Sequence, residues 1–392
     1  MNSFHKMFVP FFFFSLLCVS TIKAEFNTTL VEEVSSFIFS CSDRDGAISS
    51  NPGHRWLVPY FSGSAIIGLS RAAAFLKNQS LLDASWSHLS WHALHINKTT
   101  NYITDYERDS EEQEWNSTGD YDSTDSYAAL FLLSLQETYW AQVYLDNNKT
   151  ENANKKLKPL STAVSQSFEA IISTLDPKYN LTWAKPTYHM WYTMDNSEVL
   201  GGLDACSHLP LDDSIVEKCR EYKDIINASF EERLWSEKEG CWKIAAIKKE
   251  PNWTKPYPDV LCQLFPSEFG FFINPLDERN VAIARRVIQS VPNWYSSTSA
   301  DGSKSYTLNA ISVGLASVPV DDIRKNGKDG ALKTWEIAKS RKLGWPFHSG
   351  VAGKIILTEL WELDIPRKVV SLGSSLSYSF ILFIISFFII VF

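Results

Sequence analysis

The sequence predicts an all-α protein, an (α/α)6 toroid of six helical hairpins arranged as an inner and an outer ring. Gly and Pro are scarce for an all-β chain of this size, with 17 and 16 among 392 residues. Apolar residues recur at spacings of three and four, as they do on one face of a helix. The helical segments also alternate between charged and wholly apolar surfaces. These observations favour paired helices in two layers.

Twelve segments carry this helical periodicity. They cover residues 27–41, 62–77, 80–94, 123–144, 160–175, 195–207, 212–236, 257–270, 277–291, 304–317, 327–341 and 349–363. Residue types that cap helices stand at the start of several of them, including Asn27, Asp212 and Asp277. We expect strands only as short pieces in the connections, for example near residues 241–247.

The alternation of surfaces separates the two rings. Odd-numbered segments have a charged face, as at Glu32 and Glu33 or at residues 217–221. Even-numbered segments are apolar or small all round, as at residues 63–68 and 311–316, and such helices are buried. Buried helices alternating with exposed ones predict an inner ring inside an outer ring. A helical array of two domains is the alternative.

The two ends of the chain carry processing signals. Lys6, an apolar run from Met7 to Val19 and a site after Ala24 predict a signal peptide at residues 1–24. Residues 371–392 combine small residues with a short apolar tail, which is typical of a GPI-anchor signal, with a short tail anchor as the alternative. The toroid is then one domain at residues 25–370 of a secreted protein, held by a lipid anchor at the outer face of the plasma membrane.

Sequons and cysteines agree with secretion. Eight asparagines have the acceptor pattern for glycosylation: Asn27, Asn78, Asn97, Asn116, Asn148, Asn180, Asn227 and Asn252. The spacing of the mature cysteines suggests the disulfide bonds Cys206–Cys219 and Cys241–Cys262, with Cys41 free, although sequence alone does not fix the pairing.

Several partner and cofactor classes are disfavoured. A net charge of −8 without a long basic run argues against nucleic acid as a partner. No C-x-x-C pair, phosphate-binding loop, dinucleotide fingerprint, H-E-x-x-H or G-x-S-x-G motif occurs. We therefore expect no metal and no cofactor.

The openings of the even segments concentrate polar and aromatic residues. Because helices of one ring run parallel, these openings meet at one rim, where we expect a cleft. The candidate catalytic residues there are Asp122, Asp125, Asp195 and Glu198, and the candidate substrate-binding residues are Arg55, Tyr60, His189, Trp191, Tyr192, Asn196, Asp259, Gln263, Tyr306, Trp345 and His348.

Two of these openings carry a family resemblance. The twelve-helix rhythm, with residues 121–127 (YDSTDSY) and 194–198 (MDNSE) at inner-helix openings, resembles the six-hairpin glycosidase superfamily over residues 27–363. The resemblance is architectural, and no single family within the superfamily is matched. It implies inverting glycoside hydrolases most often, with polysaccharide lyases and sugar epimerases on related toroids.

The chemistry predicted for the rim depends on paired carboxyl groups. Glycoside hydrolysis needs one carboxylic acid for the leaving oxygen and one carboxylate for water or the sugar. We expect Asp125 and Asp195 to be the central pair, with Asp122 and Glu198 tuning these carboxyl groups or sharing their acid–base function. Helix capping by the two aspartates, or a polar core role for Glu198, is the alternative. Glu268 is a weaker candidate.

The predicted function is that of a cell-surface carbohydrate-active protein, a glycoside hydrolase acting on oligo- or polysaccharide. A lyase or epimerase on the same fold is one alternative, with Arg55 near a uronate. A toroid that binds glycans without catalysis is the other.

Overall fold

The computed structural model describes residues 25–53, 55–247, 250–269, 277–296 and 309–365. The predicted signal peptide and anchor signal lie outside these ranges, as do Tyr306 and the start of the predicted segment 304–317. Within the described part of the chain, no helix is both long enough and apolar enough to span a membrane.

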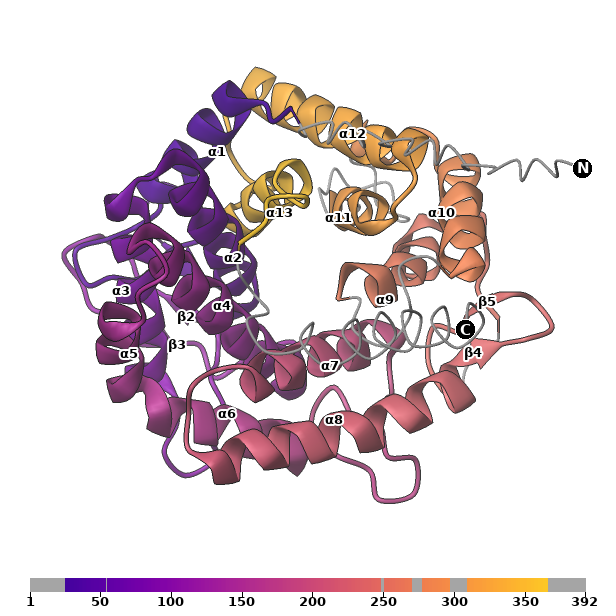
Figure 1. The fold of residues 1–392 in the computed structure, drawn as a ribbon, viewed down its shortest axis with the longest axis horizontal. Helices are drawn as coiled ribbons and strands as arrows, with labels where there is room; N and C mark the ends of the chain where they lie inside the picture. The colour runs from indigo at the N-terminus through magenta and orange to yellow at the C-terminus, as the bar shows by residue number, and fades with distance from the viewer. Residues whose placement is uncertain (1–24, 54, 248–249, 270–276, 297–308, 366–392) are drawn as a thin grey trace, which may run out of the picture.

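The described helices form two concentric rings (Figure 1). The inner ring consists of α2 (Pro59–Leu76), α4 (Thr124–Leu145), α7 (Thr193–Ser207), α9 (Phe265–Glu268), α11 (Ala310–Ser317) and α13 (Ser349–Glu359). The outer ring consists of α1 (Thr28–Ser40), α3 (Gln79–His95), α6 (Ser161–Ser173), α8 (Asp213–Leu234), α10 (Glu278–Ser290) and α12 (Asp321–Ser340). Each inner helix contacts the next, and α13 closes the ring against α2. The (α/α)6 toroid predicted from the alternation of surfaces is confirmed.

Two details depart from an ideal set of twelve helices. A short helix, α5 (Glu151–Leu157), and a 3-10 turn (Lys158–Leu160) precede α6. The eighth predicted segment is broken into a π-helical turn (Pro256–Val260), a 3-10 turn (Leu261–Leu264) and α9. Three prolines, at position 256 just before this segment and at positions 258 and 266 within it, lack the N–H that a continuous helix needs.

Short antiparallel strands occupy two of the connections. β1 (Trp56–Leu57), β2 (Tyr106–Glu107) and β3 (Asn116–Ser117) form one sheet, in which Trp56 lies opposite Glu107. β4 (Trp235–Ser236) pairs with β5 (Cys241–Trp242), within the region where a short strand was expected. Because β1 directly precedes α2, the first sheet stands at the end of the toroid where the inner helices begin.

Close packing of glycines joins the first and last inner helices. A Cβ atom on Gly68 of α2 would overlap the carbonyl of Gly353 of α13. A Cβ atom on Gly353 would overlap the backbone of Ser64 and Ala65. The two backbones are therefore in direct contact at the point where the ring closes.

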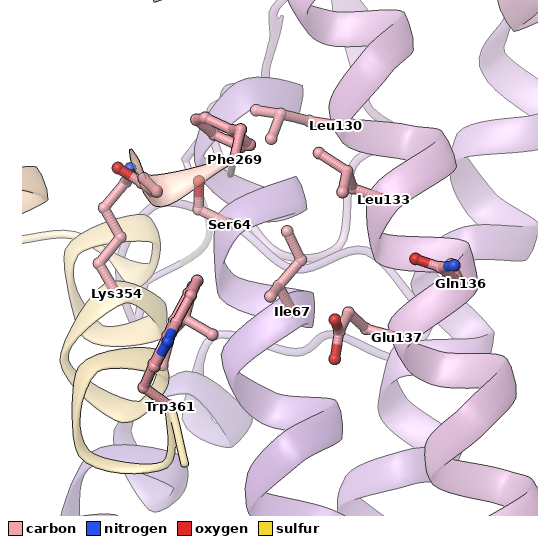
Figure 2. Close-up of a pocket in the computed structure, with 11 residues that line it drawn as sticks. Ser64, Ile67, Leu130, Leu133, Gln136, Glu137, Phe269, Lys354 and Trp361 are labelled. Atoms are coloured by element: carbon pink, nitrogen blue, oxygen red, sulfur yellow. Dashed lines mark hydrogen bonds and ion pairs between the residues drawn. The ribbon is translucent and has the colours of Figure 1, made fainter. Parts of the chain in front are cut away.

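A small axial cavity lies inside the inner ring (Figure 2). Its volume is about 50 Å³ of space for water, enough for a few molecules. Leu130, Leu133 and Glu137 follow one another along its α4 wall, and Ile67 of α2 also lines it. The lining residues of α4 lie about two to four turns beyond the start of that helix, so the cavity lies in the core below the rim.

A buried ion pair joins the second halves of α2 and α4. Arg71 Nε of α2 lies 3.2 Å from Glu137 Oε2 of α4, and both side chains are nearly inaccessible to water. An Nη atom of Arg71 also donates to the carbonyl of Leu360, 2.9 Å away, just after α13. One guanidinium thus binds three inner helices together.

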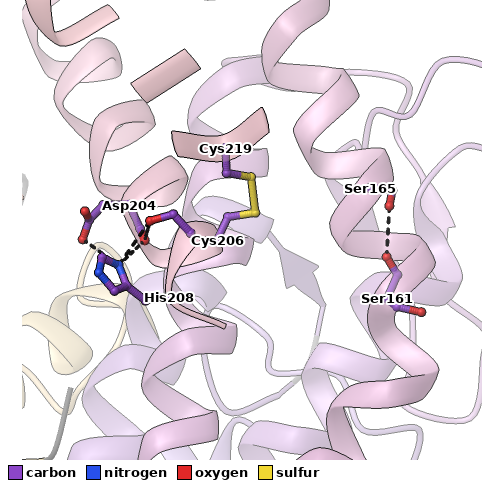
Figure 3. The surroundings of a disulfide bond; sticks show 7 residues. Ser161, Ser165, Asp204, Cys206, His208 and Cys219 are labelled. Carbon is purple, nitrogen blue, oxygen red and sulfur yellow. Dashed lines mark hydrogen bonds and ion pairs between the residues drawn. A yellow bond between two sulfur atoms is a disulfide. The ribbon is translucent and has the colours of Figure 1, made fainter. Parts of the chain in front are cut away.

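The predicted disulfide Cys206–Cys219 is confirmed, and it joins inner helix α7 to outer helix α8 (Figure 3). The predicted Cys241–Cys262 bond is wrong, because both thiols are free and buried. Cys262 Sγ instead contacts the carbonyl of Asp259 at 3.2 Å, within its own helical turn. Cys41 is free, as expected.

The eight predicted glycosylation sites are all accessible to some extent. Asn180 and Asn227 are half-buried, and the other six asparagines are exposed. Their modification stays a prediction.

Candidate active site

The first turns of α4 and α7 bring carboxyl groups together. Asp125 lies in the first turn of α4 and Asp195 in the first turn of α7, and the two helices pack side by side. Each chain segment enters its helix from extended backbone, at Ser123 and at Tyr192. The start of a helix is electropositive, which favours ionised carboxylates, so any proton held there must be stabilised by burial or by neighbouring negative charge.

Asp125 is completely buried, with 0 % of its surface exposed. Its Oδ2 accepts a hydrogen bond of 2.7 Å from the Thr182 hydroxyl, and its Oδ1 accepts one of 2.8 Å from the Ser126 amide. Burial, and to a smaller extent the charge of Glu198, raises the pKa of Asp125 to about 8 despite these bonds. Asp125 therefore holds a proton at neutral pH, behind the surface of the rim.

Asp195 is half-buried and is thus the more accessible of the two. Burial raises its pKa well above the ordinary value, and the charges of Asp125, Glu198 and Asp122 add to the effect. A carboxylic acid that stays protonated at neutral pH and has access to solvent can act as a general acid.

Glu198 lies one turn beyond Asp195 on α7. Its Oε1 accepts a hydrogen bond of 2.6 Å from the Tyr60 hydroxyl of α2. Burial raises the pKa of Glu198 to about 7, while the bond from Tyr60 and the charge of Lys354 act in the opposite direction. Burial also raises the pKa of Tyr60, so its phenol stays protonated and donates to Glu198.

Glu268 and Lys354 form an ion pair between inner helices α9 and α13. Lys354 Nζ of α13 lies 2.6 Å from Glu268 Oε1 of α9, and both side chains border the axial cavity. Among the described residues, Glu268 Oε2 has no hydrogen-bond partner although it is buried. Burial raises the pKa of Glu268, and Lys354 opposes this shift.

Sequence reasoning undervalued this pair. Glu268 was ranked as a weak candidate, and Lys354 was missed. The available signal was a single charged residue in the otherwise apolar and small-residue stretch 349–357. A lysine at such a position needs a buried partner or an opening to solvent.

Asp122 and Asp105 lie close to the same cluster. Asp122 is exposed at the entry to α4, and its amide donates to the Tyr127 hydroxyl at 3.2 Å. That hydroxyl in turn donates to Asp105 Oδ1 at 2.9 Å. Burial raises the pKa of Asp105 to about 6. Asp105 was not a candidate from the sequence, because nothing local marks it.

Three predicted substrate-binding residues instead hold the backbone. Asn196 is completely buried, and its amide bonds both the N–H and the carbonyl of Thr182. Gln263 does the same for Trp242. Asp259 is buried, and its Oδ1 accepts from the Asn252 amide at 2.8 Å. These contacts fasten loops to the toroid, and the second carboxylate oxygen of Asp259 lies 3.7 Å from Lys255 Nζ.

The predicted residues before α7 form an aromatic group. His189 is exposed and stacks on Trp183 at 3.8 Å between ring centroids. Trp191 is half-buried and packs on Tyr179. The hydroxyl of Tyr192 lies 3.0 Å from that of Tyr188.

The remaining predicted residues lie around α2 and α13. Arg55 is exposed before β1. His348 is half-buried and stacks on Phe61 at 3.7 Å, and Trp345 is 70 % exposed.

The axial cavity is not the cleft expected at the rim, because neither Asp125 nor Asp195 lines it. In the described ranges, no group of three or more His, Cys, Asp or Glu residues is arranged to hold a metal ion.

The buried carboxyl groups predict how stability depends on pH. Above about pH 6.5 these acids are ionised in the unfolded chain, whereas Asp125 and Glu198 still hold protons when folded. The folded state then binds more protons, so its stability should fall as the pH rises from about 6.5 to 9. Below about pH 6.5 three histidines have the opposite effect on stability. Burial lowers the pKa values of His88, His92 and His348, so these side chains bind protons in the unfolded chain but not in the folded protein.

Urea unfolding of the wild-type protein at pH 6.5 and pH 9 measures this effect. The Asp125→Asn variant serves as the control, since it removes one of the titrating groups and should reduce the dependence. A free energy of unfolding that rises between these pH values would contradict the protonation states described here.

Comparison with known proteins identifies the fold. No protein-family model and no curated protein sequence matches this chain. A solved glycosidase variant matches with a TM-score of 0.57 and 11 % identity, over 86 % of this chain and 97 % of its own. The chain has the six-hairpin glycosidase fold. Two further structures with this fold match it similarly. They are the GH63 mannosylglycerate hydrolase of Thermus thermophilus in complex with glucose (TM-score 0.55, 10 % identity, 86 % and 99 % coverage) and a D-mannose isomerase (TM-score 0.54, 9 % identity, 86 % and 98 % coverage).

Proposed function

We propose that this protein is a glycoside hydrolase that acts on neutral oligosaccharides. The observation that carries the proposal is Asp195, an accessible carboxyl group kept protonated by burial and by three neighbouring carboxyl groups at the rim of a six-hairpin toroid. Glycosidases with this fold, including structures with bound glucose, support a carbohydrate substrate. The acidic chain disfavours polyanionic substrates.

The proposed reaction uses carboxyl groups of two neighbouring inner helices, α7 and α9. Asp195 of α7 donates its proton to the glycosidic oxygen as the bond to the leaving sugar breaks. Glu268 of α9 holds the attacking water through Oε2, which has no partner in the described structure, and takes its proton, while Lys354 holds Oε1. Attack from the face opposite the acid inverts the configuration at the anomeric carbon. Asp125, Glu198 and Asp122 keep the proton on Asp195 before the reaction.

A second candidate reaction is sugar isomerisation, which the D-mannose isomerase neighbour favours. Isomerisation moves a proton between adjacent carbons and therefore needs a base, but no water is consumed and no glycosidic bond is broken. The two reactions differ in substrate as well as in product.

Product analysis tests the proposal. The secreted protein is incubated with gluco- and manno-oligosaccharides of two to six units, and with D-mannose alone. We expect new reducing ends from the oligosaccharides, with inverted anomeric configuration in proton NMR spectra recorded early in the reaction. Conversion of D-mannose to a ketose would favour the isomerase. Absorbance of unsaturated uronates, produced from a uronic polysaccharide, would favour a lyase.

We also propose that the protein acts outside the cell. The apolar segments at residues 1–24 and 371–392 support secretion and lipid anchoring, and eight accessible sequons are consistent with passage through the secretory pathway. Release from intact cells by a phospholipase that cleaves GPI anchors tests the attachment. Protein that stays on the membrane after this treatment would argue against a cleavable GPI anchor.

A further inference from the structure

The seam of the toroid contains a second hollow outside the inner ring. A broad groove of about 760 Å³ lies where the first and last outer helices meet. We call it the seam groove. It is bordered by Glu33 and Phe37 of α1, Asn51, Trp335 and Lys339 of α12, and Trp345. Because outer helices end where inner helices begin, the C-terminal halves of α1 and α12 place this groove at the rim that carries Asp195.

The lining of the seam groove has the chemistry of a site for a neutral sugar. Trp345 offers a ring that is 70 % exposed. The charges nearest to it are already compensated, since Lys339 Nζ lies 2.7 Å from Glu33 Oε2. The same oxygen accepts from Trp335 Nε1 at 2.7 Å. A pyranose has an apolar face that stacks on aromatic rings and an edge of hydroxyls that bonds to polar groups of this kind.

A line of rings connects the seam groove to the carboxyl cluster. Trp345 stacks on His348 with centroids 6.1 Å apart, and His348 stacks on Phe61 at 3.7 Å. Phe61 contacts Tyr60 at 6.2 Å, and the Tyr60 hydroxyl donates to Glu198. Aromatic side chains at the starts of α13 and α2 thus form a continuous series of contacts from the exposed groove to the carboxyl groups.

From this arrangement we propose that the seam groove binds sugar units of the substrate that lie beyond the reacting bond. The substrate is then a chain, which passes from the carboxyl cluster over α2 and α13 and stacks on Trp345. This inference rests on the proposed glycosidase function and adds the length and the direction of the substrate. It predicts that catalytic efficiency increases with chain length and that Trp345 causes much of the increase.

The test compares kcat/KM on gluco- and manno-oligosaccharides of two and six units. In the wild-type protein the six-unit chain should be the better substrate. Trp345→Ala should lower the ratio of the two efficiencies about tenfold, the order expected for one stacking contact, mainly through KM. Trp345→Phe should recover much of the loss, because it keeps a flat ring. Phe39→Ala is the matched control, since Phe39 is an exposed aromatic residue of α1 that does not border the groove.

A ratio that Trp345→Ala leaves unchanged, or that Phe39→Ala lowers equally, would overturn the inference. If the protein hydrolyses neither series, its migration through native gels containing mannan or glucan replaces the kinetic measurement. Retardation of the wild-type protein that is lost in Trp345→Ala then supports glycan binding at the groove although the proposed hydrolysis has failed. The absence of retardation in both gels overturns the groove as well.

Discussion

The Asp195→Asn variant should lose about 10³-fold in kcat, the range expected when a general acid is removed. Asn keeps the size of the side chain and can hydrogen-bond, but it has no proton to give to the leaving oxygen. The melting temperature should change little, because Asp195 is half-buried and the change removes an unfavourable grouping of carboxyl groups. Steady-state kinetics on the substrate found by product analysis, with thermal unfolding by circular dichroism, measures both effects.

The matched control is Asp213→Asn. Asp213 also lies in the first turn of a helix, but it belongs to outer helix α8 and is exposed far from the carboxyl cluster. Its replacement should leave kcat within about twofold. Near-normal turnover of Asp195→Asn would show that this residue only stabilises the start of its helix.

Two companion variants distinguish the roles within the cluster. Glu268→Gln should lower kcat about 10²-fold, since the amide accepts a proton poorly from water. Asp125→Asn should cost less, because Asp125 has no exposed surface with which to reach a leaving group and affects the reaction only as a neighbour of Asp195. A loss in Asp125→Asn larger than in Asp195→Asn would move the acid to Asp125 and contradict the proposed division of work.

Replacing Gly353 by Val should have the largest effect on stability. The new side chain would overlap the backbone of Ser64 and Ala65, and a backbone cannot move aside as a flexible side chain can. Helix α13 would have to withdraw from α2, which would loosen the closure of the ring. We expect a loss of about 3 kcal/mol or more in the free energy of unfolding.

Gly344→Ala is the matched control for this variant. No atom lies within 4 Å of a Cβ at this position, and the backbone there does not need glycine. Chemical denaturation should give a free energy close to that of the wild-type protein. Equal stability of Gly353→Val and Gly344→Ala would mean that α2 and α13 are not in backbone contact.

The architecture was predictable because its signal is local. The residues of a single helix determine whether its surface is apolar all round or only on one face. The alternation of segments was therefore enough to assign both rings. The break in the eighth segment was the exception. The three prolines were visible in the sequence, but helical periodicity continued through them.

The candidate site was predictable only in part, because its details depend on contacts across the fold. Asn196 and Asp195 are neighbours in a polar opening, and sequence cannot tell that one fastens Thr182 while the other is accessible. Glu268 is a candidate because it pairs with Lys354, which lies 86 residues away in the chain. Cys241 and Cys262 were paired on spacing alone, and spacing does not determine where two thiols point.

The Arg71–Glu137 pair lies beside the narrow cavity inside the inner ring. Its guanidinium joins α2, α4 and the carbonyl that follows α13, and the described cavity above it has room for only a few waters. A polymer therefore cannot be threaded through the ring. Substrate must arrive, and both products must depart, on the single face where the inner helices begin. Each turnover then requires the chain to lift off before the next bond is presented, so we expect one cut in each encounter with a glycan rather than several successive cuts without release.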